Sequence, residues 1–547
     1  MKNLNSNRAA MRKCFLLFFL LFSFYGGFAQ HVTVDWIQKK PHTIGRLITF
    51  DLNDNIIACG TYGNSAPNWS DIITIKYDSL GNTLWTTTYD DTLNNGTDRP
   101  MTMTVDTFNN VYVVGVTNLP YDFTFTNPQG VLIKYNAQGI FQWKRSWGNA
   151  QGFSASFNSM KLVNNKDIYV SGYANPITTG DPHSLLMKYD SSGIIQWVHV
   201  DSATVENYIS QIETDKAGNI YAVGTTTCCS PQYKMRLERY RPNGTRQWEY
   251  VLIDSLYTYG YGETIVIDDS SNCYLHSTIS YNFSPSGYDQ GIAKIDSSGN
   301  KKWFSPFAAN PPFYIDRSIS NVLINSKNEL FCKGTLTNSN GELIIQLLNL
   351  NPISGNINWV NSDTALRTGG IGQLFYDTLG ILSNGFNTNA SGELACVISL
   401  SNQFNGDTLW TASLFGGRNY YLYTLLFRNS NYYLYGFSYD PNLGHFYDSL
   451  ILVKLNLSQL LTSKNEDLEN EGGVFVYPNP ANEIINVSVN DESVKIKKLT
   501  LYSITGEAVL TATNRSSSVN ILTLPKGLYI LEVITSKGVE RKKIIKQ

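Results

Sequence analysis

One pattern recurs along most of this chain: an eleven-residue segment that ends in tryptophan and carries glycine four residues before it. IKYDSLGNTLW begins at Ile75, and IKYNAQGIFQW begins at Ile133. The seven segments of this kind end at Trp85, Trp143, Trp197, Trp248, Trp303, Trp359 and Trp410. Neighbouring tryptophans are 51 to 58 residues apart, a spacing typical of four-stranded propeller blades rather than of helical solenoids.

A second pattern precedes the first within each repeat: a turn residue, four strand residues and usually glycine. NVYVVG begins at Asn110 and NIYAVG at Asn219, and a further short run such as MTMTVD from Met101 lies upstream. Turns such as DSLG, with Asp first and Gly last, suit tight connections between strands. Each repeat therefore predicts three strands followed by the tryptophan strand, and the chain is predicted to be all-β.

The number of tryptophan strands predicts how the repeats close on themselves. VDWIQ around Trp36 precedes the first full repeat, whereas the last repeat ends at ILVKLNLS from Ile451 without a tryptophan strand. We expect these terminal strands to share one sheet, which completes an eight-bladed β-propeller over residues 30–457 and leaves few exposed edges. A seven-bladed ring is the alternative if the divergent stretch from 360 to 400 is misassigned. The interpretation of the eight tryptophans is packing between blades.

The N-terminus predicts export. Arg8, Arg12 and Lys13 precede an apolar run from Cys14 to Tyr25, and small residues follow at Gly27 and Ala29. This is the pattern of a secretory signal peptide, which we assign to residues 1–29. No later run approaches the ~20 apolar residues that span a bilayer, so the mature chain has no predicted integral membrane span. A net charge of −2 does not indicate a basic surface for binding nucleic acid.

The chain shows no motif for catalysis, cofactor binding or metal binding. Its 6 His residues form no HExxH, and it has neither GxSxG nor a phosphate-binding glycine loop. Most mature cysteines lie in strand-like runs and are expected to be buried thiols, while Cys228 and Cys229 stand out as an adjacent pair. Four loop carboxylates are candidates for glycoside chemistry at a propeller mouth: Asp181, Glu206, Glu263 and Asp289.

The repeats end near residue 457, and a different segment follows. Residues 458–473 read as an acidic linker, and residues 474–547 alternate like the strands of a small Ig-like antiparallel β-sandwich. The tail contains YPNP, LYSITGEAV, LPKGLYILEV and a basic end. Its motif residues are Tyr477, Pro478, Asn479, Pro480, Gly506, Gly527, Tyr529, Lys542 and Lys543.

These tail motifs resemble the type A C-terminal sorting domain of the type IX secretion system in Bacteroidetes. The resemblance implies export to the periplasm, transit through the outer membrane by the type IX secretion machinery, and release or attachment at the cell surface. The repeats resemble the bacterial SBBP propeller family, which implies a fold and no activity. Their D-x-x-G-x-x-x-W pattern is also similar to the tryptophan-docking motif of quinoproteins, but no recognisable cofactor ligands accompany Cys228 and Cys229.

The leading hypothesis is a secreted or cell-surface binding and scaffold protein with a carbohydrate or protein ligand. Its candidate binding face consists of aromatic loop residues, namely Trp69, Trp147, Tyr257, Tyr259, Tyr261 and Phe313. Two alternatives remain open at this point: a secreted polysaccharide-active hydrolase or lyase, and a structural component of the cell surface. No cofactor or metal ion is predicted for any of the three.

Overall fold

The computed structural model describes most of the chain after the expected signal peptide. The described residues are 33–63, 70–91, 96–119, 128–178, 181–201, 206–227, 233–252, 257–281, 288–307, 317–337, 343–363, 374–377, 380–388, 394–404, 406–414, 419–429, 431–439, 449–456, 474–477, 481, 483–489, 495–503, 507–513, 517–536 and 538–546. The expected signal peptide and acidic linker therefore lie outside the described residues, as do Cys228, Cys229, Gly506 and Pro478 to Pro480.

The chain is all-β, and its contacts divide it into two units, residues 1–457 and 458–547. The described residues of the first unit form eight four-stranded antiparallel sheets, which we number along the chain. Sheets 1 to 4 consist of β2 (Thr43–Phe50), β3 (Ile56–Gly63), β4 (Ser70–Tyr77) and β5 (Thr83–Tyr89); β6 (Thr97–Val105), β7 (Val111–Leu119), β8 (Gln129–Tyr135) and β9 (Phe141–Trp147); β10 (Phe153–Val163), β11 (Asp167–Pro176), β12 (His183–Asp190) and β13 (Ile195–Val200); and β14 (Asn207–Thr214), β15 (Ile220–Thr226), β16 (Lys234–Tyr240) and β17 (Arg246–Val251).

Sheets 5 to 8 continue the same order. They consist of β18 (Tyr257–Ile267), β19 (Cys273–Tyr281), β20 (Tyr288–Ile295) and β21 (Lys301–Pro306); β22 (Arg317–Ile324), β23 (Leu330–Thr337), β24 (Leu343–Leu350) and β25 (Ile357–Asp363); β26 (Leu374–Asp377), β27 (Gly380–Thr388), β28 (Leu394–Ser401) and β29 (Thr408–Leu414); and β30 (Asn419–Arg428), β31 (Asn431–Tyr439), β32 (Ser449–Asn456) and β1 (Thr33–Pro41). A single 3₁₀ turn, η1 (Asn149–Gln151), lies between β9 and β10.

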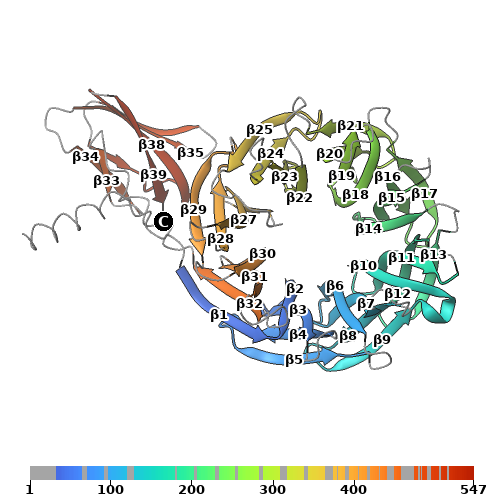
Figure 1. The fold of residues 1–547 in the computed structure, drawn as a ribbon. Coiled ribbons are helices and arrows are strands. Elements are labelled where there is room, and N and C mark those ends of the chain that lie inside the picture. The colour runs from blue at the N-terminus through green and yellow to red at the C-terminus, as the bar shows by residue number, and fades with distance from the viewer. Residues whose placement is uncertain are drawn as a thin grey trace, which may run out of the picture. The chain divides into compact units, whose positions relative to one another are not determined.

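Within the first unit, the sheets follow one another around a circle in a propeller-like arrangement (Figure 1). The first strands, such as β2, β6 and β14, face the middle, while the tryptophan strands, such as β5, β9 and β17, lie on the outside. Sheet 8 joins the two ends of this unit, because β1 runs antiparallel to β32 with Thr33 opposite Asn456 and Pro41 opposite Ser449. The chain's first strand is thus the outer strand of its last sheet.

The two ends of the sheets carry different connections. Within a sheet, tight turns join the first strand to the second and the third to the fourth, as at 51–55 and 78–82. The remaining connections emerge at the opposite end and are often longer, since β21 ends at Pro306 and β22 begins only at Arg317. We call these ends the turn side and the loop side. Binding and catalytic residues are often found on loops that a rigid scaffold positions.

Aspartate side chains build the tight turns. Asp51 Oδ1 accepts hydrogen bonds from the backbone N–H groups of Asn53 at 2.8 Å and Asn55 at 2.9 Å. The Asn55 amide donates to Asp51 Oδ2 at 2.9 Å. Asp78 makes the same set of bonds to Leu80 and Asn82. The recurring Asp and the Asn four residues later are therefore explained by turn chemistry.

The cores of the first unit lie between neighbouring sheets. Ile57 and Cys59 of sheet 1, for example, pack with Val111, Val113 and Ile133 of sheet 2, and all five are fully buried. Among the described residues, four cysteines are buried free thiols: Cys59, Cys273, Cys332 and Cys396. Burial raises the pKa of Cys59 to about 12, so this thiol stays protonated and unreactive at neutral pH.

The second unit has two antiparallel sheets with a core of their own. One sheet contains β33 (Val474–Tyr477), β34 (Ile484–Val489) and β37 (Ser518–Asn520). The other has the order β36 (Ala508–Thr513), β35 (Ile496–Ser503), β38 (Gly527–Thr535) and β39 (Val539–Lys546). Ile485, Leu499, Leu531 and Ile544 are buried in one cluster that draws on both sheets.

Candidate functional site

Seven of the eight tryptophans contact the glycine turn of the next sheet. The Trp85 indole N–H donates to the carbonyl oxygen of Ala137 at 3.1 Å, and its ring lies directly over Gly139. Gly139 has φ +77°, and a methyl group on its α carbon would stand 2.5 Å from the Trp85 ring. The same ring-on-glycine contact is made by Trp36 with Gly81, Trp143 with Gly193, Trp197 with Gly244, Trp248 with Gly299, Trp303 with Gly355 and Trp359 with Gly406. Trp410 lies on β29, and its side chain is outside the described residues.

A basic residue completes this contact and was missed in the sequence analysis. Lys76 Nζ donates to the Ala137 carbonyl at 3.3 Å, the same oxygen that Trp85 contacts. It also lies 2.6 Å from a carboxylate oxygen of Asp51. Burial alone raises the pKa of Asp51, but hydrogen bonds from Lys76 and Asn55 outweigh burial and lower it. The signal was visible, because a Lys or Arg stands nine residues before tryptophan in five repeats: Lys76, Lys134, Lys188, Arg239 and Lys294.

Gly139→Ala should destabilise the protein more than Gly152→Ala. Both glycines have left-handed φ angles, +77° and +84°, so both substitutions carry a similar backbone cost. Only at Gly139 does the new methyl group meet the Trp85 ring, because nothing lies within 4 Å at Gly152. We expect an additional loss of about 1–3 kcal/mol for Gly139→Ala, measured by urea denaturation. Equal losses for the two variants would mean that the indole does not hold the turn.

The loop side gathers several of the predicted carboxylates and aromatic residues near sheets 4 and 5. Tyr233 donates a hydrogen bond to Glu206 at 2.9 Å and stacks on Tyr261 with ring centroids 5.3 Å apart. Glu263, two residues after Tyr261, accepts a hydrogen bond from Thr278. Its other carboxylate oxygen lies 3.5 Å from Nδ1 of the buried His276 ring. Burial lowers the pKa of His276, although the charge of Glu263 acts in the opposite direction.

Two further sequence candidates lie in other sheets: Trp147 at the end of β9 and Asp181 just before β12. Trp147 is wrong as a binding-face residue, because it is only 4% exposed and stacks on Phe153 beneath the surface. Asp181 is exposed just before β12. Trp69 and Phe313 lie outside the described residues, as do the side chains of Tyr257, Tyr259 and Asp289.

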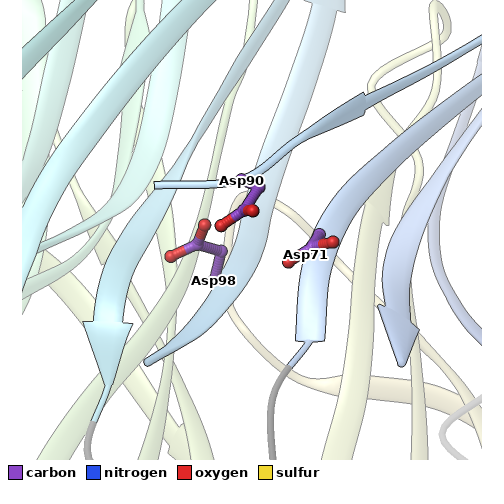
Figure 2. Close-up of side chains that lie close together, drawn as sticks. All are labelled: Asp71, Asp90 and Asp98. Atoms are coloured by element: carbon purple, nitrogen blue, oxygen red, sulfur yellow. The ribbon is translucent and has the colours of Figure 1, made fainter. Parts of the chain in front are cut away.

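Three aspartates converge where sheets 1 and 2 meet on the loop side (Figure 2). Asp71 is the second residue of β4, Asp90 follows β5, and Asp98 lies on β6, with one carboxylate oxygen of each within 4.8 Å of the others. Asp98 is buried and accepts backbone hydrogen bonds from Asp91 and Asn118. Burial raises the pKa of Asp98 to about 6, and burial together with the charge of Asp90 raises that of Asp71 to about 6. Carboxylates at this spacing also suit a hard cation, but the cluster alone does not assign one.

Asp71→Asn should stabilise the protein at neutral pH. A carboxyl group whose folded pKa lies above its unfolded value destabilises the fold above pH 6, and this cost disappears as the pH falls from 6 to 4. We therefore expect a rise in Tm of about 1–3 °C at pH 7.5 and none at pH 4.5. Asp78→Asn is the matched control, and it should lower the Tm at pH 7.5 instead of raising it. The reason is that hydrogen bonds from Asn82 hold the pKa of Asp78 below its usual value. A rise for Asp71→Asn that persists at pH 4.5 would contradict charge repulsion as its cause.

A pocket of about 300 Å³ lies between sheets 3 and 4. Its lining residues are Ser184, Leu186, His199, Val200, Asp201, Ile209, Glu238, Tyr240 and Arg246. Glu238 is only 1% exposed and is paired with Arg236 at 2.6 Å and Arg246 at 2.8 Å. Burial, the charge of Glu238 and a hydrogen bond to it raise the pKa of the Tyr240 hydroxyl. No motif in the sequence indicated this pocket.

The tail motifs lie in the second unit. Tyr477 ends β33, and Gly527 begins β38. Tyr529 is buried on β38, and its hydroxyl donates to the carbonyl oxygen of Pro525 at 2.9 Å. Lys542 pairs with Glu540 at 3.3 Å on β39, and Lys543 is exposed on the same strand.

Residues 475–547 match the family described as the secretion system C-terminal sorting domain. The tail is a type IX secretion sorting domain. This sorting domain marks the chain for secretion or for the cell surface. Within the described residues, no helix has the length and apolar composition needed to cross a membrane.

Several solved structures are distantly similar to this chain. No curated protein sequence shows significant similarity to it. A quinohemoprotein alcohol dehydrogenase of Pseudomonas putida HK5 is 10% identical, covers 85% of this chain and 80% of its own, and has a TM-score of 0.46. The polysaccharide lyase Uly1 is 10% identical over 76% of this chain and 90% of its own, with a TM-score of 0.42. The β-propeller domain of the Trilobed protease from Pyrococcus furiosus is 8% identical over 65% and 92%, with a TM-score of 0.36. TM-scores below 0.5 assign neither a cofactor nor an activity to this chain.

Proposed function

We propose that this protein is a secreted or cell-surface binding and scaffold protein carried out of the cell by its sorting domain. The single observation that carries this proposal is the sorting domain at the end of a long array of four-stranded sheets. In the proposed route, a signal peptide at residues 1–29 directs the chain to the periplasm. The type IX machinery then recognises the tail, residues 474–547, and moves the chain across the outer membrane.

The proposed architecture is an eight-bladed β-propeller over residues 30–457, an acidic linker over 458–473 and an Ig-like sandwich at the end. The eight four-stranded sheets and the pairing of β1 with β32 support the propeller. Two antiparallel sheets around one core support the sandwich.

The ligand of this propeller is a carbohydrate or a protein bound on the loop side. Stacked tyrosines beside a carboxylate, as in Tyr233, Tyr261 and Glu206, support this proposal. Aromatic rings offer a flat apolar surface with polar edges, and both sugars and protein interfaces use such surfaces.

A binding screen of the mature chain against glycans and surface polysaccharides, followed by product analysis of each hit, tests this function. Binding without turnover supports a recognition protein. Turnover would favour the hydrolase or lyase alternative, for which Glu206 and Glu263 near sheets 4 and 5 are the first residues to substitute. No binding, combined with ordered self-assembly, would favour a structural surface component.

A further inference from the structure

Sheet 4, which forms one side of this pocket, differs from sheets 1 to 3 at defined positions of the repeat. Arg236 lies opposite Gly224, the glycine of the second strand, and Glu238 lies two residues further along β16. The residues in the position of Arg236 in sheets 1 to 3 are Ile73, Val131 and Leu185. Those in the position of Glu238 in sheets 1, 2, 3 and 5 are Ile75, Ile133, Met187 and Ala293. All seven are buried apolar residues.

Sheet 4 thus replaces a buried apolar pair with two charges. Burying a carboxylate and a guanidinium costs free energy, and well-packed apolar residues of similar size are often as stable or more stable. The fold does not need this exchange, because three neighbouring sheets of the same design do without it. Residues that break a repeat's own packing rule are expected at functional sites.

The charges form a network that reaches the pocket wall through Asp201, Glu238 and Arg246. Arg236 contacts Asp201 at 2.8 Å, Glu238 at 2.6 Å and Glu249 at 2.7 Å. Arg246 contacts Glu238 at 2.8 Å through the same oxygen that Arg236 uses, Oε1. Two guanidinium groups and three carboxylates leave one excess negative charge. Arg236, Glu238, Arg246 and Glu249 each contact at least two members of the network, so these groups are ordered before a ligand arrives.

The pocket has a polar mouth and a mixed interior. Arg246 and His199 are exposed at its rim, whereas Tyr240 and Ile209 are buried inside. The His199 ring lies between Trp197 and Tyr240, at centroid distances of 5.2 and 5.6 Å. Its Nε2 lies 2.6 Å from the Gly244 carbonyl and therefore carries the proton, which leaves Nδ1 as the acceptor in the neutral ring.

We propose that this pocket binds a single sugar ring, an inference that rests on the proposed function as a surface binding protein. Its volume of about 300 Å³ lies at the small end of ligand pockets and suits one six-membered ring. Leu186, Val200 and Ile209 offer apolar contact for the C–H face of such a ring. Carboxylate oxygens accept, and guanidinium N–H groups donate, hydrogen bonds of the kind that sugar hydroxyl groups make. The excess negative charge selects neutral sugars and amino sugars over acidic ones.

The first test measures binding of glucose, galactose, N-acetylglucosamine and glucuronate to the mature full-length chain by saturation-transfer NMR and calorimetry. We expect at least one of the first three to bind and glucuronate to bind weakest. Arg246→Gln should weaken binding by about tenfold or more, because it removes a charged hydrogen-bond donor from the pocket. Arg241→Gln, an exposed arginine at the start of the same hairpin, should leave binding unchanged.

The second test restores the packing of sheet 3 within sheet 4. Arg236→Leu combined with Glu238→Met copies Leu185 and Met187 into the equivalent positions. We expect this double variant to keep or raise its Tm while losing sugar binding. Retained binding in the double variant, equal effects of Arg246→Gln and Arg241→Gln, or no binding of any panel sugar would overturn the inference. If polysaccharides or proteins still bind the chain in those cases, the proposed function stands and only this pocket assignment fails.

Discussion

Removal of residues 474–547 should leave the protein inside the cell envelope. The deleted segment contains the sorting domain and its separate core, so the sheets of the first unit lose none of their own packing. We expect the amount of protein at the cell surface and in the medium to fall from most of the total to near background. Cell fractionation with an antibody against the first unit measures this distribution.

Two controls separate a sorting defect from misfolding. The retained protein should show the same Tm and protease resistance as the first unit of the full chain. Conversely, residues 458–547 fused to an unrelated folded reporter with a signal peptide should carry that reporter out. Surface or secreted protein at full-length levels after deletion of the tail would contradict the assigned role of this domain.

The repeat made much of the fold predictable from sequence. Turn residues and alternating strands locate the four-stranded units, since their spacing depends only on local backbone chemistry and burial. The pattern diverges between residues 360 and 400, and a repeat was nevertheless predicted there. In the structure β26, β27 and β28 form three strands of sheet 7 in this region. Lys76 and its equivalents could also be recognised in the sequence from their fixed distance to tryptophan. Their role could not, because it depends on a carbonyl oxygen of the next sheet, such as that of Ala137.

The candidate sites could not be located in the same way. Ser184 and Arg246 share a pocket although 62 residues separate them, and Asp71 meets Asp98 across two sheets. Side chains from different repeats come together through register and strand order, which a list of motifs does not contain. One signal was nevertheless present: Glu238 stands ten residues before its tryptophan, where the other six segments carry uncharged residues. A charge that departs from the pattern of a repeat is therefore a sequence indication of a functional site.

Deleting residues 30–41 should weaken the first unit more than any single substitution in it. This deletion removes β1, which pairs with β32 from Thr33 opposite Asn456 to Pro41 opposite Ser449. It also removes Trp36, whose indole lies over Gly81 and donates to the Ser79 carbonyl at 3.3 Å. Loss of a buried aromatic residue costs about 3–5 kcal/mol. Trp36 is only partly buried, so loss of its side chain should cost less than this. Loss of the pairing between β1 and β32 should supply the remaining destabilisation. We expect a fall in Tm of about 10 °C.

The exposed edge of β32 gives this prediction a second readout. An unpaired central strand exposes a row of backbone donors and acceptors, which promotes association between molecules. The deletion variant should therefore elute as dimers or larger species, whereas Trp36→Ala should melt at an intermediate temperature and remain monomeric because β1 still covers β32. Val34→Ala, on the same strand but 37% exposed, should differ little from the wild type. A deletion variant that melts within about 2 °C of the full chain would show that the sheets hold together without the N-terminal strand.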